Sequence, residues 1–307
     1  MQTAYISHHD CLLHEMGPYH PESPARLRAV EDQLIASGLF PLLQHHDAPL
    51  ASREQIERVH APAYVDEIFA RSPAHGMVYL DPDTAMNPHT LQAALRAAGG
   101  AVLAVDLVMA GKAKNAFCNV RPPGHHAESA RAMGFCIFNN VAVGVAYVLE
   151  EHGLTRVAIA DFDVHHGNGT EEIFRNDPRV MLCSTFQHPF YPHCGADTVS
   201  DHIINVPLPA GTDGAGFREA VIRRWLPELE RFEPEMVFFS AGFDAHRDDE
   251  MAGLRLVEAD YQWVTEQVKA IAEKYAQGRI VSVLEGGYEL SALGRSAAAH
   301  IKALSGL

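Results

Sequence analysis

Short apolar runs alternate along the chain with longer stretches whose apolar residues recur at helical spacing. The runs read "AFCNV", "RVAIADFD", "VMLCST", "MVFFSAGFD" and "RIVSVLEGG", and a helix is expected over about 138–153, between the first two. This alternation is typical of β-α units around a mostly parallel sheet. Runs such as "MVFFSA" are apolar at every position, as expected of strands that helices cover on both faces. Without an internal repeat or a long polar linker, the pattern predicts one α/β domain over residues 1–307.

Polar residues follow three of these runs directly. Asp161, Asp163 and His165 come after "VAIA", Asp244 comes after "VFFSAGF", and the segment 285–288, "EGGY", comes after "IVSVL". In open parallel sheets, ligands bind outside the carboxyl ends of the strands. The sequence therefore predicts that these side chains meet at one edge of the sheet.

Composition narrows the class of protein. Of the 307 residues, 47% are hydrophobic and 21% are charged, so the chain can bury a large core. The formal net charge of −15 argues against nucleic-acid binding and would attract cationic ligands. The five cysteines form no C-x-x-C pair, which favours reduced thiols in a cytoplasmic protein. We expect a soluble protein without a membrane partner, because we find neither a targeting segment nor a run of about 18 apolar residues.

The stretch "DFDVHHGNG" is the densest group of candidate ligands. On an extended backbone, Asp161, Asp163 and His165 would share one side. Two carboxylates and an imidazole in a dry site are poorly satisfied unless a cation organises them, although hydrogen-bonded loop groups are the simpler alternative. A calcium loop is excluded, because its sixth position should be glycine and is His166. Imidazole favours zinc, iron or another transition metal.

A second cluster, "RPPGHHAE", places His125 and His126 after an expected strand. Adjacent histidines on an extended backbone diverge, so two acid–base groups with separate partners fit better than one chelating pair. Asp161 and Asn168 are candidate partners, and two structural histidines remain the alternative. Neither a G-x-S-x-G elbow nor a phosphate loop occurs, and Cys136 stands among apolar residues, which indicates packing.

Six ordered motifs carry a resemblance to a known family. They are "HPESPARL", "RPPGHHA", "GFCIFNN", "DFDVHHGNGT", "SAGFDAH" and "LEGGYEL", and they span roughly residues 5–305. In order and spacing the chain resembles the histone deacetylase family, most closely its class II and bacterial amidohydrolase members. The resemblance implies the arginase–deacetylase α/β fold, with a central parallel sheet of eight strands. It also implies hydrolysis of N-acyl amides with one divalent metal, zinc or, in the cell, ferrous iron.

The resemblance assigns roles to the residues of these motifs. It implies that Asp163, His165 and Asp244 bind zinc, an open three-ligand set expected of a catalytic site. His125 paired with Asp161, and His126 paired with Asn168, are similar to the family's proton-handling histidines. Tyr288 matches the tyrosine that donates a hydrogen bond to the substrate carbonyl. Zinc and this phenol would polarise the amide, and His126 would help to activate water.

Further residues are implied for the substrate tunnel and for potassium. Aromatic walls would come from Phe135 and Tyr191, and either Asp81 or Asp83 would hold the substrate backbone. The remaining substrate-binding candidates are Gly134, Met251 and Gly287. One potassium site would use Asp161, Asp163, His165, Ser184 and Thr185, and a second would use the backbone around Phe174, Asp177 and Val180.

Substrate identity is left open by a departure from the family pattern. After Asp244 the chain reads "AHRDDEMAG", where relatives have a Gly-Asp-Pro segment. Met251 is expected where polyamine deacetylases carry a glutamate, and Glu250 lies one position away. We therefore expect an acyl-lysine deacetylase acting on proteins or peptides, with an acetylpolyamine or small N-acyl-amine deacetylase as the alternative. The sequence does not decide whether the chain forms a homo-oligomer.

Two other functional classes are alternatives. A binuclear manganese hydrolase of the arginase type shares the fold, but Gly167 and His246 stand where such enzymes carry metal carboxylates. A non-catalytic acyl-amine binding protein is disfavoured by Tyr288 and by the intact pair of histidines.

Overall fold

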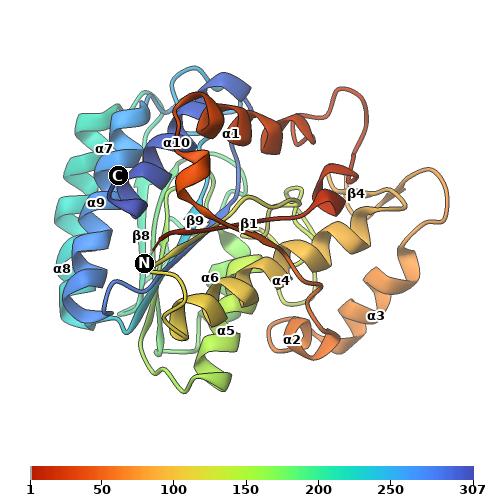
Figure 1. Ribbon diagram of the computed structural model, residues 1–307, viewed down its shortest axis with the longest axis horizontal. Coiled ribbons are helices and arrows are strands. Elements are labelled where there is room, and N and C mark those ends of the chain that lie inside the picture. Colours follow the sequence, from red (N-terminus) through yellow and green to blue (C-terminus); the bar gives the residue numbers. More distant parts are fainter. Residues whose placement is uncertain (1) are drawn as a thin grey trace.

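Eight parallel strands form the central sheet of the computed structural model, which describes residues 2–307 (Figure 1). The strand order is β2-β1-β5-β10-β9-β6-β7-β8. The expected α/β class and the eight-stranded sheet are confirmed. The strands are β1 (Ala4–Ser7), β2 (Gln44–Asp47), β5 (Ala116–Cys118), β6 (Val157–Asp161), β7 (Val180–Gln187), β8 (Ile203–Leu208), β9 (Met236–Ala241) and β10 (Ile280–Leu284). A separate antiparallel pair consists of β3 (Val78–Tyr79) and β4 (Ala85–Met86).

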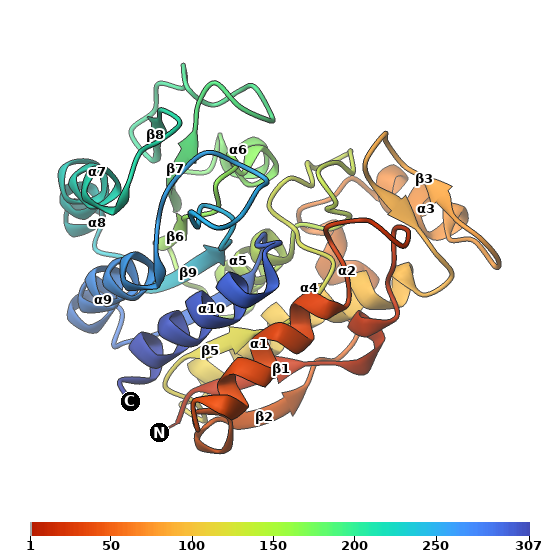
Figure 2. The same ribbon diagram turned by 90° about the horizontal axis from the view of Figure 1, so that it is seen from above.

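Helices cover both faces of the sheet (Figure 2). On one side α1 and α9 pack against α10, and α7 and α8 pack against α9. On the other side α4 packs against α5 and contacts β1, β5 and β10. The helices are α1 (Ala25–Ala36), α2 (Arg53–Glu57), α3 (Pro62–Arg71), α4 (Thr90–Met109), α5 (Asn140–Glu151), α6 (Asn168–Phe174), α7 (Gly214–Ala220), α8 (Leu226–Phe232), α9 (Glu258–Tyr275) and α10 (Leu290–Ser305). Shorter turns are η1 (His9–Leu12), η2 (Phe40–Leu42) and the π-helical η3 (Val221–Trp225).

The apolar runs form the inner strands because both faces of these strands are buried. Every residue of β5, β6, β7, β9 and β10 is buried. The edge strand β2, by contrast, reads "QHHD" and alternates between half-buried and exposed positions. Because its residues are polar, the sequence pattern did not predict this strand. All pairings within the main sheet are parallel.

Helix α4 is long and apolar enough, by length and composition, to cross a membrane. It contains no unbroken run of about 18 apolar residues, because Gln92, Arg96 and Asp106 interrupt its sequence. In the fold, 72% of its most apolar window is buried. Its apolar surface is thus accounted for by packing against the sheet and α5.

The strand order places the polar motifs side by side. Strands β5, β10, β9 and β6 are consecutive neighbours, and each is followed at its carboxyl end by one of the motifs. The motif loops begin at Asn119, Glu285, Gly242 and Phe162. The expected convergence at one sheet edge is confirmed, because a parallel sheet brings the carboxyl ends of its strands to the same side.

A buried histidine makes the stability of the fold sensitive to acid. His300 of α10 lies between Ser282 of β10 and Thr265 of α9, with contacts of 2.7 Å and 2.6 Å to their hydroxyl oxygens. Burial lowers the pKa of His300 to about 3. The unfolded chain therefore binds a proton at this residue below about pH 6.5, while the folded chain does so only near pH 3. The free energy of unfolding must fall as the pH falls through this window.

Replacing His300 tests this linkage. His300→Gln should flatten the pH dependence of the free energy of unfolding between pH 6.5 and 4, by up to about 1.4 kcal/mol per pH unit. Urea unfolding at several pH values measures the slope. His75→Gln, at an exposed histidine, is the control and should keep the slope of the original protein. An unchanged slope in His300→Gln would show that this histidine does not couple folding to pH.

Candidate active site

Three buried side chains converge at the carboxyl ends of β6 and β9. Strand β6 ends at Asp161, and the following loop carries Asp163 and His165, while Asp244 follows β9. Nδ1 of His165 lies 3.1 Å from Oδ1 of Asp163 and 3.3 Å from Oδ2 of Asp244. One ligand atom from each residue lies within 4.8 Å of the other two. The set predicted from the sequence can therefore hold a metal ion.

Backbone groups fix these two carboxylates in place. The amides of Gly286 and Val164 donate to Oδ2 of Asp163 and Oδ1 of Asp244, both at 2.9 Å. Oδ2 of Asp244 is buried and makes no hydrogen bond within the part of the chain that the structure describes. A buried carboxylate oxygen without a donor is costly unless a cation contacts it. The donor set thus fits a divalent metal.

Two glycines make room for this crowding. A Cβ atom at Gly242 would collide with the carboxylate of Asp163, and one at Gly286 would collide with that of Asp244. Both residues stand in the loops immediately after β9 and β10. The glycines of "SAGFD" and "LEGGY" are thus required by close approach to the carboxylates.

The shifted pKa values of Asp244 and His165 also indicate that these buried carboxylates need a positive charge beside them. Burial, followed by the neighbouring charge of Asp163, raises the pKa of Asp244 to about 6. Burial would lower the pKa of His165, but its contacts with Asp163 and Asp244 outweigh burial and raise it to about 9. A proton on His165 therefore compensates two carboxylates. A divalent cation bound by the same atoms would displace that proton.

The two adjacent histidines have separate partners, as expected. Nδ1 of His125 lies 3.0 Å from Oδ2 of Asp161, and Nδ1 of His126 lies 2.8 Å from Oδ1 of Asn168. Burial would lower the pKa of His125, but Asp163 and Asp161 outweigh burial and raise it well above its usual value. Burial, reinforced by His125 and His165, holds the pKa of His126 well below its usual value. The pair thus combines a protonated with a neutral imidazole.

Glu285 supports the histidine loop from β10. Its Oε2 accepts hydrogen bonds from the amides of Gly124, at 2.7 Å, and His125, at 3.1 Å. Burial raises the pKa of this carboxyl to about 7. The sequence indicated Glu285 as a strand-end polar group, and the structure shows that it holds backbone.

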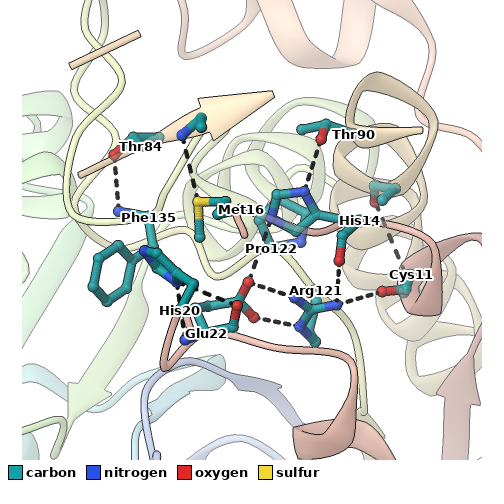
Figure 3. A network of polar contacts seen from close by, with 12 residues as sticks. Cys11, His14, Met16, His20, Glu22, Thr84, Thr90, Arg121, Pro122 and Phe135 are labelled. Atoms are coloured by element: carbon teal, nitrogen blue, oxygen red, sulfur yellow. Dashed lines mark hydrogen bonds and ion pairs between the residues drawn. The ribbon is translucent and has the colours of Figure 1, made fainter. Parts of the chain in front are cut away.

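A buried charged network connects the histidine loop with the tyrosine loop, and Figure 3 shows the part of it around Glu22 and Arg121. Glu22 accepts hydrogen bonds from both Arg121, which precedes the histidines, and Arg26 of α1. Arg26 donates in turn to the carbonyls of Glu285 and Gly287, and its guanidinium lies 5.0 Å from the ring centre of Tyr288. These three charged residues stand in the motifs "HPESPARL" and "RPPGHHA", but the sequence analysis assigned them no role, because no local pattern marks a buried ion pair.

Asp163, His165 and Asp244 are called the metal-binding cluster below, because they could hold a metal ion. A narrow cavity of about 150 Å³ leads to this cluster and reaches His165. Phe135 and Tyr191 lie in its wall, as expected, together with Gly134 and Met251. Its full lining is Asp83, His126, Gly134, Phe135, His165, Phe190, Tyr191, Met251 and Tyr288. Phe190 was not predicted, although its ring stacks on His165 with the centres 5.5 Å apart.

Two substrate-binding candidates are not in the wall. Of the two aspartates left open, Asp83 lines the cavity, whereas Asp81 is not in the lining and accepts a hydrogen bond from the amide of Asp83 at 2.9 Å. Gly287 is not among the residues that line the cavity, and its carbonyl accepts a hydrogen bond from Arg26, so its contact with substrate stays a prediction.

The residues expected around potassium lie in two places. Ser184 and Thr185 are buried in β7, where Ser184 pairs in register with Asp161. The hydroxyl of Ser184 has no hydrogen-bond partner among residues 2–307. Phe174, Asp177 and Val180 form consecutive turns after α6, in which the amides of Asp177 and Val180 donate to the carbonyls of Phe174 and Asp177.

Residue 167, where an arginase-type site would carry a metal carboxylate, has no room for a side chain. A Cβ atom there would approach Oδ2 of Asp161 to 2.5 Å and Nδ1 of His125 to 3.1 Å. Nδ1 of His246 accepts the amide of Asp248 at 3.1 Å. Neither position supplies a carboxylate toward the metal-binding cluster.

Comparison with known proteins gives the family. Residues 20–304 match the model of the histone deacetylase domain. The chain is 37% identical to the histone deacetylase-like amidohydrolase of Pseudomonas aeruginosa, over 100% of this chain and 87% of that protein. It is 35% identical to the polyamine deacetylase HDAC10 of Mus musculus, over 100% of this chain and 48% of that protein.

A solved structure extends the likeness to the fold. The crystal structure of the HDA15 HD domain superposes with a TM-score of 0.91 at 34% identity, covering 99% of this chain and 88% of that one. The chain therefore belongs to the histone deacetylase family and is a hydrolytic deacetylase.

Proposed function

We propose that the protein is a zinc-dependent deacetylase that removes acetyl or other short acyl groups from Nε-acyl-lysine in peptides or proteins. The observation that carries this proposal is the meeting of Asp163, His165 and Asp244 with two histidines and a tyrosine at the end of a narrow aromatic cavity. Such a cavity fits the flat, extended side chain of an acylated lysine.

Asp163, His165 and Asp244 would hold the metal. When bound there, zinc would act as a Lewis acid toward the substrate carbonyl and toward water. Two oxygens and one nitrogen from the protein leave positions free for both.

His126 is the group suited to take a proton from water. Its Nδ1 faces Oδ1 of Asn168, so the proton of the neutral ring resides on Nδ1 and Nε2 keeps its lone pair. The low pKa keeps the ring neutral near pH 7. Attack of water on the carbonyl carbon transfers one proton to this nitrogen. As the C–N bond breaks, a protonated histidine returns a proton to the amine, which leaves with acetate as the second product.

Tyr288 supplies a hydrogen-bond donor for the carbonyl oxygen. Burial raises the pKa of its phenol well above the usual value, so the hydroxyl stays protonated at neutral pH. Arg26 and Phe135 pack against its ring, the latter with centres 5.9 Å apart. A donor held in place before reaction stabilises the developing oxyanion without reorganisation.

A monovalent cation, potassium by family resemblance, is part of the proposal. The hydroxyl of Ser184, which has no hydrogen-bond partner in the part of the chain that the structure describes and lies opposite Asp161 in the sheet, supports such a site next to the metal-binding cluster. A cation there would offset the charge of Asp161. The turns around Asp177 are the proposed second site.

The substrate preference rests on Met251. This residue lines the cavity, whereas Glu250 is exposed and lies in a neighbouring hollow of about 300 Å³ with Asp248 and Glu289. An apolar side chain at the wall suits the aliphatic stem of lysine better than the second ammonium of a polyamine. The alternative, deacetylation of acetylpolyamines or small N-acyl amines, is supported by the likeness to the mouse polyamine deacetylase and by the acidic hollow.

Removing one metal ligand should remove the metal. Asp244→Ala should weaken zinc binding by at least about tenfold and abolish hydrolysis of an acetyl-lysine peptide, because one of three protein ligands is lost. Elemental analysis and competition with a chelating dye measure both variants. Asp248→Ala, at an exposed carboxylate of the same loop, is the control. Unchanged affinity in Asp244→Ala would refute the ligand set, and two tightly bound equivalents in the original protein would favour a binuclear site.

Removing the phenol should affect turnover. Tyr288→Phe should keep zinc content and thermal stability but lower kcat by about 10²-fold or more, since one oxyanion donor contributes roughly 2.7–4 kcal/mol. Steady-state hydrolysis of an acetyl-lysine peptide gives the value. If kcat does not change, Tyr288 has no part in the reaction.

Changing the cavity wall should change substrate choice. The original protein should hydrolyse acetyl-lysine peptides with higher kcat/KM than acetylspermidine or acetylputrescine. Met251→Glu should shift that ratio toward the polyamines by about tenfold, or about 1.4 kcal/mol, because a carboxylate can pair with the distant ammonium. Met251→Leu is the control and should keep the ratio. A tenfold preference for an acetylpolyamine in the original protein would support the alternative.

A further inference from the structure

Asn168 can keep the proton of His126 on Nδ1 only if the oxygen of its side-chain amide faces the histidine. Oδ1 must face Nδ1 of His126, so that the imidazole proton sits on Nδ1 and Nε2 stays free to accept a proton. An asparagine turned by 180° would present its NH₂ group instead. The histidine would then carry its proton on Nε2, where it cannot take another. A carboxylate at this position would accept the hydrogen bond from His126 in either orientation, because both of its oxygens are acceptors.

The orientation is fixed by what lies on the other side of the amide. Nδ2 of Asn168 donates to Oε1 of Glu128 at 2.8 Å. Two weaker acceptors lie on the same side, Sδ of Met133 at 3.3 Å and the carbonyl of His126 at 3.4 Å. If the amide were turned, Oδ1 would take the place of Nδ2 against the carboxylate oxygen. Two acceptors at that distance repel each other, so Glu128 excludes the wrong orientation.

Glu128 is itself held in place. Its amide donates to the carbonyl of Arg131 at 3.0 Å, and its carbonyl lies 3.0 Å from Nδ1 of the buried His60. Arg131 also donates to Oε1 of Glu128, at 3.3 Å. Both side-chain bonds therefore go to one oxygen of the carboxylate. The side chain is 27% exposed, so its replacement leaves no buried cavity.

We propose that Glu128 is a positioning residue that selects the tautomer of His126 by fixing the amide of Asn168. Glu128 lies beyond Asn168 and acts on the reaction only through it. The proposal rests on the proposed function in one respect, the use of Nε2 of His126 as the proton acceptor. It predicts that the acceptor oxygen of residue 128 matters and that its negative charge does not.

Two substitutions separate these effects. Glu128→Gln keeps a carbonyl oxygen in the place of Oε1 and should retain kcat within about threefold. Glu128→Leu removes the acceptor and should lower kcat by about tenfold or more with little change in KM, since general-base catalysis contributes about 10²–10⁴-fold and the weaker acceptors preserve part of it. An equal loss in Glu128→Gln would overturn the proposal in favour of a charge effect.

Glu172 provides a matched control. This partly buried carboxylate anchors the same loop through the amide and hydroxyl of Ser129, at 2.9 and 2.8 Å, and among residues 2–307 its side chain makes no hydrogen bond to the side-chain amide of Asn168. Glu172→Leu should keep kcat near that of the original protein. A loss as large as that of Glu128→Leu would mean that the loop as a whole, and not the amide, is responsible.

A double substitution tests the mechanism directly. In Asn168→Asp, either oxygen can accept from His126, so Glu128 is no longer needed to choose between them. Glu128→Leu should therefore cause no further loss of kcat in that background. A tenfold loss that persists there would refute the proposal.

The tautomer can also be read without substrate. Selective ¹⁵N labelling of histidine in the zinc-loaded protein, with His126→Gln to assign the signals, should show His126 protonated on Nδ1. Glu128→Leu should shift these resonances toward the Nε2-protonated form, and Glu128→Gln should not. Unchanged ring resonances in Glu128→Leu would contradict the proposal. Because no turnover is involved, this result stands even if acetyl-lysine proves not to be the substrate.

Discussion

The crowding of buried carboxylates at one sheet edge is the constraint on which the site depends. Asp161, Asp163 and Asp244 lie at neighbouring strand ends with almost no exposed surface. Like charges so close in a dry environment are strongly unfavourable without compensation. The compensation comes from protonated imidazoles, from backbone amides and, by proposal, from metal and potassium ions. The chemistry follows from this constraint, because the groups that neutralise the carboxylates are those that bind and activate a substrate.

A parallel sheet is well suited to this arrangement. Each inner strand is buried on both faces and ends at the same side, so loops separated by more than a hundred residues deliver their side chains to one place. The amide of Gly286, for example, donates to Asp163 from 123 residues away. Small residues at the first loop positions let the chain approach the carboxylates closely. The rigid core thus holds the reacting groups without relying on mobile segments.

Behind the site, buried ion pairs hold the loops together. Glu22 accepts hydrogen bonds from Arg121, which precedes the histidines (Figure 3), and from Arg26, which holds the tyrosine loop. Burial of such charges is tolerable because every guanidinium in this network has carboxylate or carbonyl acceptors. The network gives the two loops a common support, so that His126 and Tyr288 keep their positions relative to the metal-binding cluster.

The sequence by itself predicted the α/β class, five of the six inner strands and the meeting of polar side chains at their carboxyl ends, whereas the family resemblance supplied the ligand set Asp163, His165 and Asp244. It could do so because continuous apolar runs mark doubly covered strands, and because polar groups directly after them must gather where parallel strands end. The family motifs then supplied roles for His125, His126 and Tyr288. Polar edge strands such as β2 were not identified, since they lack an apolar run.

Only the tertiary structure decided which side chains stand behind and beside these groups. It placed Asp83 and Phe190 in the cavity wall and turned the carbonyl of Gly287 toward Arg26. It also placed Glu128 against the amide of Asn168. The contact between Glu128 and Asn168 joins residues 40 positions apart, and that between Arg26 and Gly287 joins residues 261 positions apart. Local periodicity records neither, because it reports burial along one element and not the partner that another element supplies.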